Sequence, residues 1–218
     1  DRFETREDFA LSTMFLSHLT SHNDPRISEF AELPLSGGDF TGVAYGVENP
    51  NVLQSEVSFI DSDIIYDGTQ RGGVIYSYAQ VAFSVAEAAV RGWNSQSAAD
   101  WYKKGIQASM DQWGISSTNA AAYIAQSEVQ FKTSKAMEQI ATEKWVSLYL
   151  QGFEAWAEWR RLDYPQLNAA PDALSGNGIP TRYGYSANTA ALNEANYKAA
   201  VSAQGADTQD TKLWWDKK

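Results

Sequence analysis

Few side chains in this sequence have the types and spacing that acid–base catalysis requires. Glu154 and Glu158 stand four residues apart, which places both carboxyl groups on one face of a helix. A glycosidase needs two carboxyl groups about 5–10 Å apart, so this pair qualifies by residue type. Arg160 and Arg161 follow directly, however, and opposite charges at such spacings form ion pairs. We therefore interpret the two glutamates as partners in ion pairs and predict no catalytic residue.

Histidine and aspartate offer two candidate metal sites. His18 and His22 also stand four residues apart, but no third ligand follows them. Asp61, Asp63 and Asp67 cluster without the spacing or the closing glutamate of a calcium-binding loop. Cysteine is absent, which excludes disulfides and cysteine-based zinc sites. We predict no metal and no cofactor, and we leave a structural calcium ion open as an alternative.

Aromatic residues outside the helical patterns are better candidates for ligand binding. Phe40, Tyr45 and Tyr66 lie in a glycine-rich region, and Tyr183 and Tyr185 lie in a late loop. No periodic helix face accounts for them, and loops on a rigid scaffold are where binding residues concentrate. Aromatic rings can also stack on the C–H faces of sugar rings. We predict ligand contacts among these five residues, with the alternative that some of them only fasten loops to the core.

The composition narrows the class of partner. The chain of 218 residues has 27 acidic and 17 basic side chains, for a formal charge of −10. This balance argues against nucleic acid, because phosphate binding relies on lysine and arginine. It also argues against docking on anionic lipid. Hydrophobic residues at 44% fit a folded globular chain, and no run of 18 apolar residues suggests a membrane span.

The elements that would position these residues are predicted to be mainly helical. One long helix is expected over residues 134–163, where apolar side chains recur with a period near 3.6 and Pro165 ends the pattern. Helices at 76–92 and from Asn94 or Ser97 to Gly114 should form a hairpin that resembles a tetratricopeptide unit. These elements give a helical core at about 76–163.

The remaining segments are shorter or irregular. A helix-compatible stripe covers residues 3–22, and a short helix is expected at 119–127. Residues 33–75 hold seven glycines and read as long loops with one short strand, Glu56–Ile60. A C-terminal loop and helix region covers 165–218, with a helix at Glu194–Gln204 that Ser186 or Asn188 precedes as cap.

Several short motifs occur in a fixed order along the chain. They are Asn23-Asp24-Pro25-Arg26; Ser77-Tyr78-Ala79-Gln80 followed by Ala86-Glu87-Ala88; Glu143-Lys144-Trp145 followed by Glu154 to Arg161; and Ile179 to Tyr183 followed by Thr211 to Asp216. Together they resemble the SusD/RagB family of outer-membrane nutrient-binding lipoproteins, in its SusD-like branch. The chain resembles only the C-terminal half of such proteins, as a single portion over residues 1–218.

The resemblance implies a cell-surface protein without enzymatic activity. Such a protein captures an oligosaccharide or peptide on the extracellular face of the outer membrane. It delivers this ligand to a SusC-like TonB-dependent transporter, and it is held to the membrane by an N-terminal lipid anchor that is absent from this chain. Two other classes stay open: a helical-repeat module that binds a protein and no small ligand, and, less favoured, a glycoside hydrolase.

Overall fold

A computed structural model describes residues 9–66, 73–173 and 178–216 of the chain. The chain divides into two compact units, the first formed by residues 1–45 and 49–165 and the second by residues 46–48 and 166–218. Each unit is helical in its described residues, where pairing between extended segments is limited to three isolated bridges. The expected mainly helical fold is therefore confirmed.

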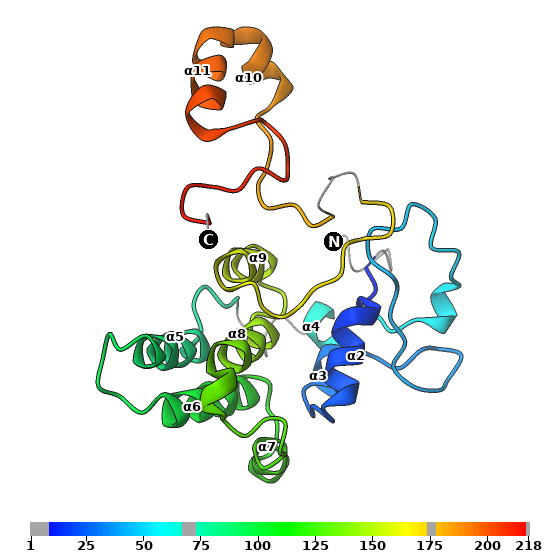
Figure 1. Cartoon of the computed structure of the whole chain (residues 1–218). Coiled ribbons are helices and arrows are strands. Elements are labelled where there is room, and N and C mark those ends of the chain that lie inside the picture. The colour runs from blue at the N-terminus through cyan, green and yellow to red at the C-terminus, as the bar shows by residue number, and fades with distance from the viewer. Residues whose placement is uncertain (1–8, 67–72, 174–177, 217–218) are drawn as a thin grey trace. The chain divides into compact units, whose positions relative to one another are not determined.

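The centre of the first unit is the expected helical hairpin. Helix α5 (Tyr78–Val90) and helix α6 (Ala98–Gln112) lie side by side, and α8 packs on both (Figure 1). Ser77 and Gln80 form a reciprocal capping box at the start of α5, and Ser97 caps α6 as predicted. The two helices approach closely at Gly105, where an added Cβ would lie 2.6 Å from the ring of Phe83.

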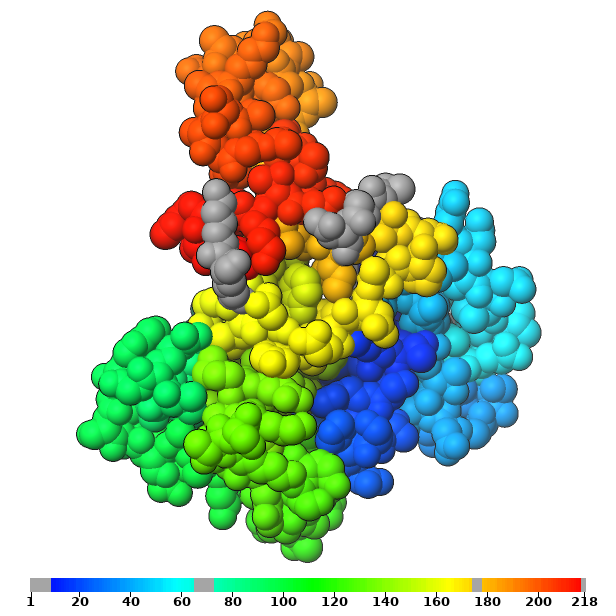
Figure 2. All heavy atoms as spheres, in the orientation of Figure 1, coloured from blue at the N-terminus to red at the C-terminus, as the bar shows by residue number. Residues whose placement is uncertain are grey.

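Two more helices complete the core of this hairpin. They are α7 (Ser117–Ile124) and α8 (Ala136–Ser147), the latter preceded by a 3₁₀ turn, η2 (Thr133–Lys135). Figure 2 shows the outer surface of these elements in green, and the apolar cluster that they share lies beneath it. The buried members of this cluster come from all four helices and the segment after α7: Ala79, Phe83, Ala86, Tyr102, Ile106, Met110, Ala120, Tyr123, Val129 and Ile140.

The single helix expected over residues 134–163 is wrong. Helix α8 ends at Ser147, and a separate helix, α9 (Gly152–Leu162), follows a turn in which Leu150 has a φ of +66°. Apolar periodicity did not reveal the break because Leu148, inside the turn, is as buried as a core helix residue. Gly152 was the available signal, since glycine is about 1 kcal/mol worse than alanine inside a helix. The predicted end before Pro165 is confirmed.

A second apolar cluster surrounds the N-terminal helices. Helix α2 (Thr13–Ser21) begins at its cap Ser12, and the short helix α3 (Ile27–Phe30) follows the Asn23-Asp24-Pro25 turn. The observed helix is therefore shorter than the expected range 3–22, of which residues 3–8 lie outside the described residues. The ring of Phe15 stacks on Phe30 and Tyr149 at centroid distances of 5.8 and 5.4 Å, which joins α2, α3 and the end of α8.

The glycine-rich region is fastened to this cluster through its backbone. It contains the 3₁₀ turn η1 (Gln54–Glu56) and the helix α4 (Ser62–Tyr66). The expected strand Glu56–Ile60 is wrong, because only isolated bridges form there, from Phe59 to Ala10 and from Ile60 to Ala31. Residues 41–43 and 57–59 instead lie against the chain around Leu11, where the amide of Leu11 donates to Ser58 at 3.1 Å and that of Val43 to Leu11 at 2.9 Å.

The second unit is a small helical pair held by one ion pair. Helix α10 (Ala187–Leu192) is capped by Ser186, and α11 (Glu194–Gln204) has the predicted bounds. Arg182 lies before the pair, Asp207 after it, and their side chains are 3.0 Å apart. Among the described residues of both units, no helix has the length and apolar character needed to cross a bilayer.

The turn between α8 and α9 supplies a matched stability test. Leu148 is 1% exposed and Leu150 is 53% exposed, so only the first contributes its side chain to the core. Leu148→Ala should lower the free energy of unfolding by about 2–5 kcal/mol. Leu150→Gly should be neutral or stabilising by up to about 1 kcal/mol, because glycine accepts a positive φ without strain. Urea unfolding of both variants measures this, and equal losses would contradict the described turn.

Candidate functional site

The charged residues of the first motif form a buried network. The guanidinium of Arg26 donates to Asp24 at 2.5 and 2.9 Å, to Glu143 at 3.0 Å and to the hydroxyl of Ser109 at 2.9 Å. The phenol of Tyr123 donates to the other oxygen of Glu143 at 2.6 Å. The network joins the turn after α2 to α6, α7 and α8. These side chains are occupied in holding the fold.

The electrostatics of this network follow from burial and close opposite charges. Burial disfavours the charged guanidinium, but Asp24 and Glu143 outweigh it and raise the pKa of Arg26 further. Burial raises the pKa of Glu143, with Asp24 adding to the shift and Arg26 opposing it. Burial also raises the pKa of Tyr123, which keeps its proton as the donor to Glu143. The network is therefore built to keep one cation charged between two carboxyl groups.

The motif residues of α5, α8 and α9 form a second network. Arg161 contacts Glu87 at 2.5 Å and Glu158 at 2.6 Å. Arg91 also contacts Glu87, at 2.8 Å, and Lys144 contacts Glu158 at 3.1 Å. The prediction that Glu158 belongs to ion pairs is confirmed. Its carboxylate is held between two cations, Lys144 and Arg161.

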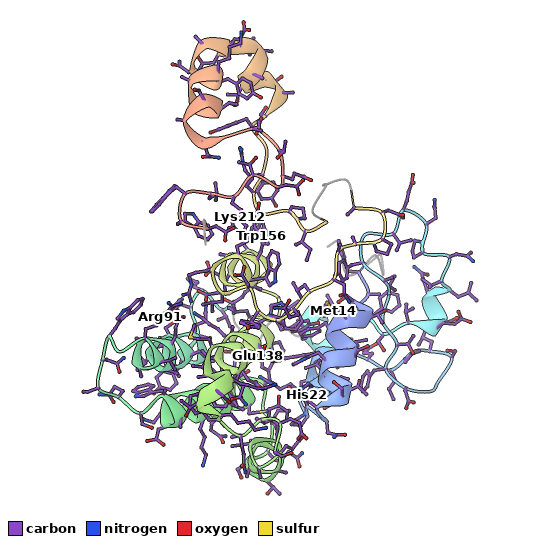
Figure 3. The ribbon with its side chains drawn as sticks, in the orientation of Figure 1. Met14, His22, Arg91, Glu138, Trp156 and Lys212 are labelled. Carbon is purple, nitrogen blue, oxygen red and sulfur yellow. The ribbon has the colours of Figure 1, made fainter. Side chains whose placement is uncertain are left out.

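The other half of the suspected acid pair is placed differently. Glu154 lies exposed in the first turn of α9, where its charge faces the positive end of the helix dipole. On the same helix the guanidinium of Arg160 stacks over Trp156 at 3.9 Å from the ring centroid (Figure 3). This intramolecular stacking gives the arginine at the helix end a structural role.

The candidate metal residues do not assemble into a coordination sphere. The rings of His18 and His22 lie 4.4 Å apart, and Asp61 accepts a hydrogen bond from the amide of Asp63 at 3.0 Å. Asp67 lies outside the described residues. Within the parts of the chain that the structure describes, no group of three or more His, Asp or Glu side chains could hold a metal ion.

The loop aromatics of the first unit differ in exposure. Phe40 is partly buried and packs against the cluster around Phe15. Tyr45 is exposed, with its hydroxyl 3.8 Å from the sulfur of Met14 on α2 (Figure 3). Tyr66 was expected in a loop but ends helix α4, and its side chain lies outside the described residues. Of the candidates here, Tyr45 has a described and accessible ring.

The two late tyrosines belong to the second unit. The ring of Tyr183 is 68% exposed. Tyr185 is held more firmly, because Arg182 lies over its ring at 5.0 Å and Tyr197 meets it edge-on at 5.8 Å. Asp207 accepts from the Tyr185 amide at 3.1 Å and from the Tyr197 hydroxyl at 3.2 Å. The ion pair of Arg182 and Asp207 thus fixes a small aromatic group next to Tyr183 in the sequence.

Among the described residues, Trp93 and Trp214 are the most exposed tryptophans, and sequence reasoning did not propose either as a ligand contact. Trp93, in the turn after α5, is 74% exposed and carries Arg91 over its ring at 5.3 Å. Trp214, near the C-terminus, is 81% exposed. The signal for Trp93 was its place after Gly92 in the turn of the hairpin, where no helix face buries it. Trp214 belongs to the motif Thr211 to Asp216, which indicated only the family resemblance.

Comparison with known proteins gives consistent results. A family model described as SusD-like, starch-binding and associating with the outer membrane matches residues 2–186. Among curated proteins, no relative matches the chain.

Solved structures match over nearly all of the chain. A chitin-binding protein is 28% identical with a TM-score of 0.85, over 100% of this chain and 52% of its own. A chitin-binding SusD homologue from Flavobacterium johnsoniae is 25% identical with a TM-score of 0.80. The match covers 95% of this chain and 49% of the homologue. A SusD homologue from Bacteroides thetaiotaomicron shares the fold with a TM-score of 0.83 at 22% identity. The match covers 100% of this chain and 54% of the homologue. The chain thus spans about half the length of these relatives.

The buried network predicts a large effect of one substitution. Arg26→Met leaves two buried carboxyl groups without their cation, which should lower the free energy of unfolding by about 3–5 kcal/mol. Lys135→Ala is the matched control, because its 3.9 Å pair with Glu138 is exposed and should contribute less than about 1 kcal/mol. Urea unfolding of both variants measures the free energy of unfolding that each has lost. Equal small losses would show that the carboxyl groups find other partners.

The second network predicts a dependence on pH. Burial opposes ionisation of Glu87, but hydrogen bonds from Arg161 and Arg91 outweigh it and lower the pKa of this carboxyl. The folded pKa is below the unfolded one, so the ionised carboxylate stabilises the fold above about pH 4.3 and loses this effect as pH falls through the folded pKa. Glu87→Gln should cost about 1–3 kcal/mol at neutral pH.

The difference in free energy of unfolding between the Glu87→Gln variant and the unchanged chain should become smaller below about pH 4. The midpoints of urea unfolding of both proteins, compared at neutral and at acidic pH, measure this change. Glu138→Gln, at the exposed pair, is the control and should have little effect at neutral pH. A difference for Glu87→Gln that stays constant with pH would exclude the ionised carboxylate as the source of its stabilising effect.

Proposed function

Because the chain belongs to the SusD-like family, we propose that it is part of a cell-surface receptor that captures a carbohydrate. The observation that carries the proposal is the match of the whole chain to a chitin-binding protein at 28% identity and a TM-score of 0.85. The ligand we favour is an oligosaccharide, and a peptide is the alternative. Since the chain spans about half of its relatives, further ligand contacts can come from the other half of a longer protein.

The proposed ligand contacts are the loop aromatics. Tyr183 offers the most accessible ring among the described candidates, with 68% of its surface exposed, while Tyr45 and Tyr185 are 37% and 38% exposed. Each ring can stack on one sugar ring, which adds about 0.5–1.5 kcal/mol beyond the area buried. Phe40 and Tyr185 stand closer to packed structure and would shape the surface. Tyr66 remains a candidate by its position in the sequence.

The proposed receptor breaks no bond in its ligand. The ionisable motif residues that could serve as acid or base are engaged with each other, as for Glu143 with Arg26 and Glu158 with Lys144. Hydrolysis of a glycoside needs two carboxyl groups free to face the scissile bond. This supports binding without catalysis over the glycoside hydrolase alternative.

We extend the proposal to location and partner on the basis of the family. The receptor acts on the extracellular face of the outer membrane and passes its ligand to a SusC-like TonB-dependent transporter. A lipid group at the N-terminus of the longer protein would hold it there. The support is the family description, which associates its members with the outer membrane.

A second candidate function is a helical module that binds another protein. The observation that favours it is a row of exposed apolar side chains at and before the start of α5. They are Val74, Ile75, Tyr76, Tyr78 and Val81. Exposed apolar rows of this kind often mark protein contacts. A protein partner and a carbohydrate ligand would use different surfaces, so the following experiment separates them.

Calorimetry with chitin and starch oligosaccharides tests the carbohydrate proposal. Tyr45→Ala and Tyr183→Ala should each weaken binding about two- to twelve-fold, because each removes one stacking ring. Their thermal midpoints should stay nearly unchanged, since both rings are exposed. Tyr76→Ala is the matched control, with a tyrosine 60% exposed at the other surface. The oligosaccharide should be recovered intact by mass spectrometry.

Three results would contradict the proposal. Wild-type affinity in both loop variants would place the ligand contacts elsewhere. Weaker binding in Tyr76→Ala alone would favour the surface at the start of α5. Shortened oligosaccharide in excess of the protein would favour the hydrolase.

A further inference from the structure

A pocket of about 260 Å³ lies within the first unit, lined by α2, α6, α8 and the segment between α7 and α8. A water molecule takes about 30 Å³ of liquid volume, so this space exceeds that of a few structural waters. It falls just below the range of about 300–1,000 Å³ typical of drug-sized ligands. Its size therefore suits one small molecule.

The lining of the pocket is mostly polar. Figure 3 labels two of its side chains, His22 at the end of α2 and Glu138 on α8. The set is His18, His22, Tyr102, Glu128, Val129, Lys132, Lys135, Glu138, Gln139, Thr142 and Glu143. Most of these carry a hydrogen-bonding group. Such a lining favours a ligand with many hydrogen-bonding groups of its own.

One lining residue has an unsatisfied polar atom. The Nε2 atom of His18 is buried and has no hydrogen-bond partner within the described part of the chain. Burial lowers the pKa of His18 to about 4, and the charge of His22 adds to this shift, so the imidazole is neutral at pH 7. Buried nitrogens without a protein partner are usually satisfied by a water or a bound molecule.

The charges around the pocket cancel. Glu128 and Glu138 oppose Lys132 and Lys135, and the carboxyl group of Glu143 is engaged with Arg26. Apart from His22, the charged side chains of the lining thus have no excess of either sign to select an anion or a cation. It offers ammonium donors and carboxylate acceptors together, which is what a hydroxyl group needs, because a hydroxyl both donates and accepts.

We propose that this pocket binds one neutral, polyhydroxylated ring, a single sugar unit, between α2 and α8. The site consists of side chains from α2, α6, α8 and the segment between α7 and α8, and contains none of the loop aromatics. It would hold its ring by hydrogen bonds, with Thr142 and the charged side chains at its wall as the contacts. It stands independently of the proposed role for Tyr45 and Tyr183.

Nuclear magnetic resonance of the full chain with labelled histidine tests the proposal. The probes are D-glucose and N-acetylglucosamine, with inorganic phosphate as the charged alternative. Either sugar should shift the His18 and His22 signals saturably, with a dissociation constant of about 1–10 mM for a ligand of this size. Phosphate should cause no saturable shift.

Two substitutions at one position link the shift to the pocket. Thr142→Leu fills space at the wall and should weaken sugar binding at least about ten-fold. Thr142→Val keeps the volume of the side chain but removes the hydroxyl, and should weaken sugar binding about three- to ten-fold. This variant also serves as the test if Thr142→Leu fails to fold. Tyr45→Ala is the matched control and should leave the histidine shifts unchanged.

The outcomes that overturn the proposal are distinct. No saturable shift with either sugar would mean that the pocket holds only water. A saturable shift with phosphate alone would mean an anion site. Shifts lost in Tyr45→Ala but kept in both Thr142 variants would assign them to the loop surface. Failure of oligosaccharides to bind the loops would leave this pocket unaffected.

Discussion

The first unit depends on one buried cation. Arg26 is fully buried and lies between two carboxyl groups, one two residues away and the other 117 residues away on α8. A buried ion pair adds little net stability compared with packed apolar side chains, but removing one member leaves an uncompensated charge. The arginine therefore acts mainly on specificity. It allows only the arrangement in which Asp24, Ser109 and Glu143 surround it.

The same logic explains why the family motifs are poor guides to a binding site. Their charged residues are partners of one another, as in the contact of Arg161 with both Glu87 and Glu158. A side chain in such a contact has little freedom to recognise a ligand. We therefore propose that recognition relies on aromatic residues outside the charged networks, such as Tyr45 and Tyr183. The charged motif residues hold the scaffold together, and exposed aromatic residues carry the proposed function.

Local signals in the sequence predicted local structure well. Ser97 and Gly114 marked the ends of α6 correctly, because capping depends on nearby backbone groups. The turn at Leu150 escaped because Leu148, inside the turn, is as buried as a core helix residue and so continues the apolar pattern. The contact of Arg26 with Glu143 was also not predicted, because the sequence gives no distance between residues that are 117 positions apart. For the candidate site, the sequence reduced the aromatic residues to five candidates but could not show how exposed each ring is.

The way the glycine-rich region is fastened has a consequence for how such a protein can diversify. Its anchors at Val43 and Ser58 are main-chain hydrogen bonds, which form with nearly any side chain present. Gly42 is an exception, because an added Cβ would collide with the backbone of Thr13, and so are Val57 and Ser58, whose side chains are buried. The exposed positions described in this region can therefore change by mutation without loosening its attachment. Such changes would alter the proposed ligand contacts while the stability of the fold is little affected.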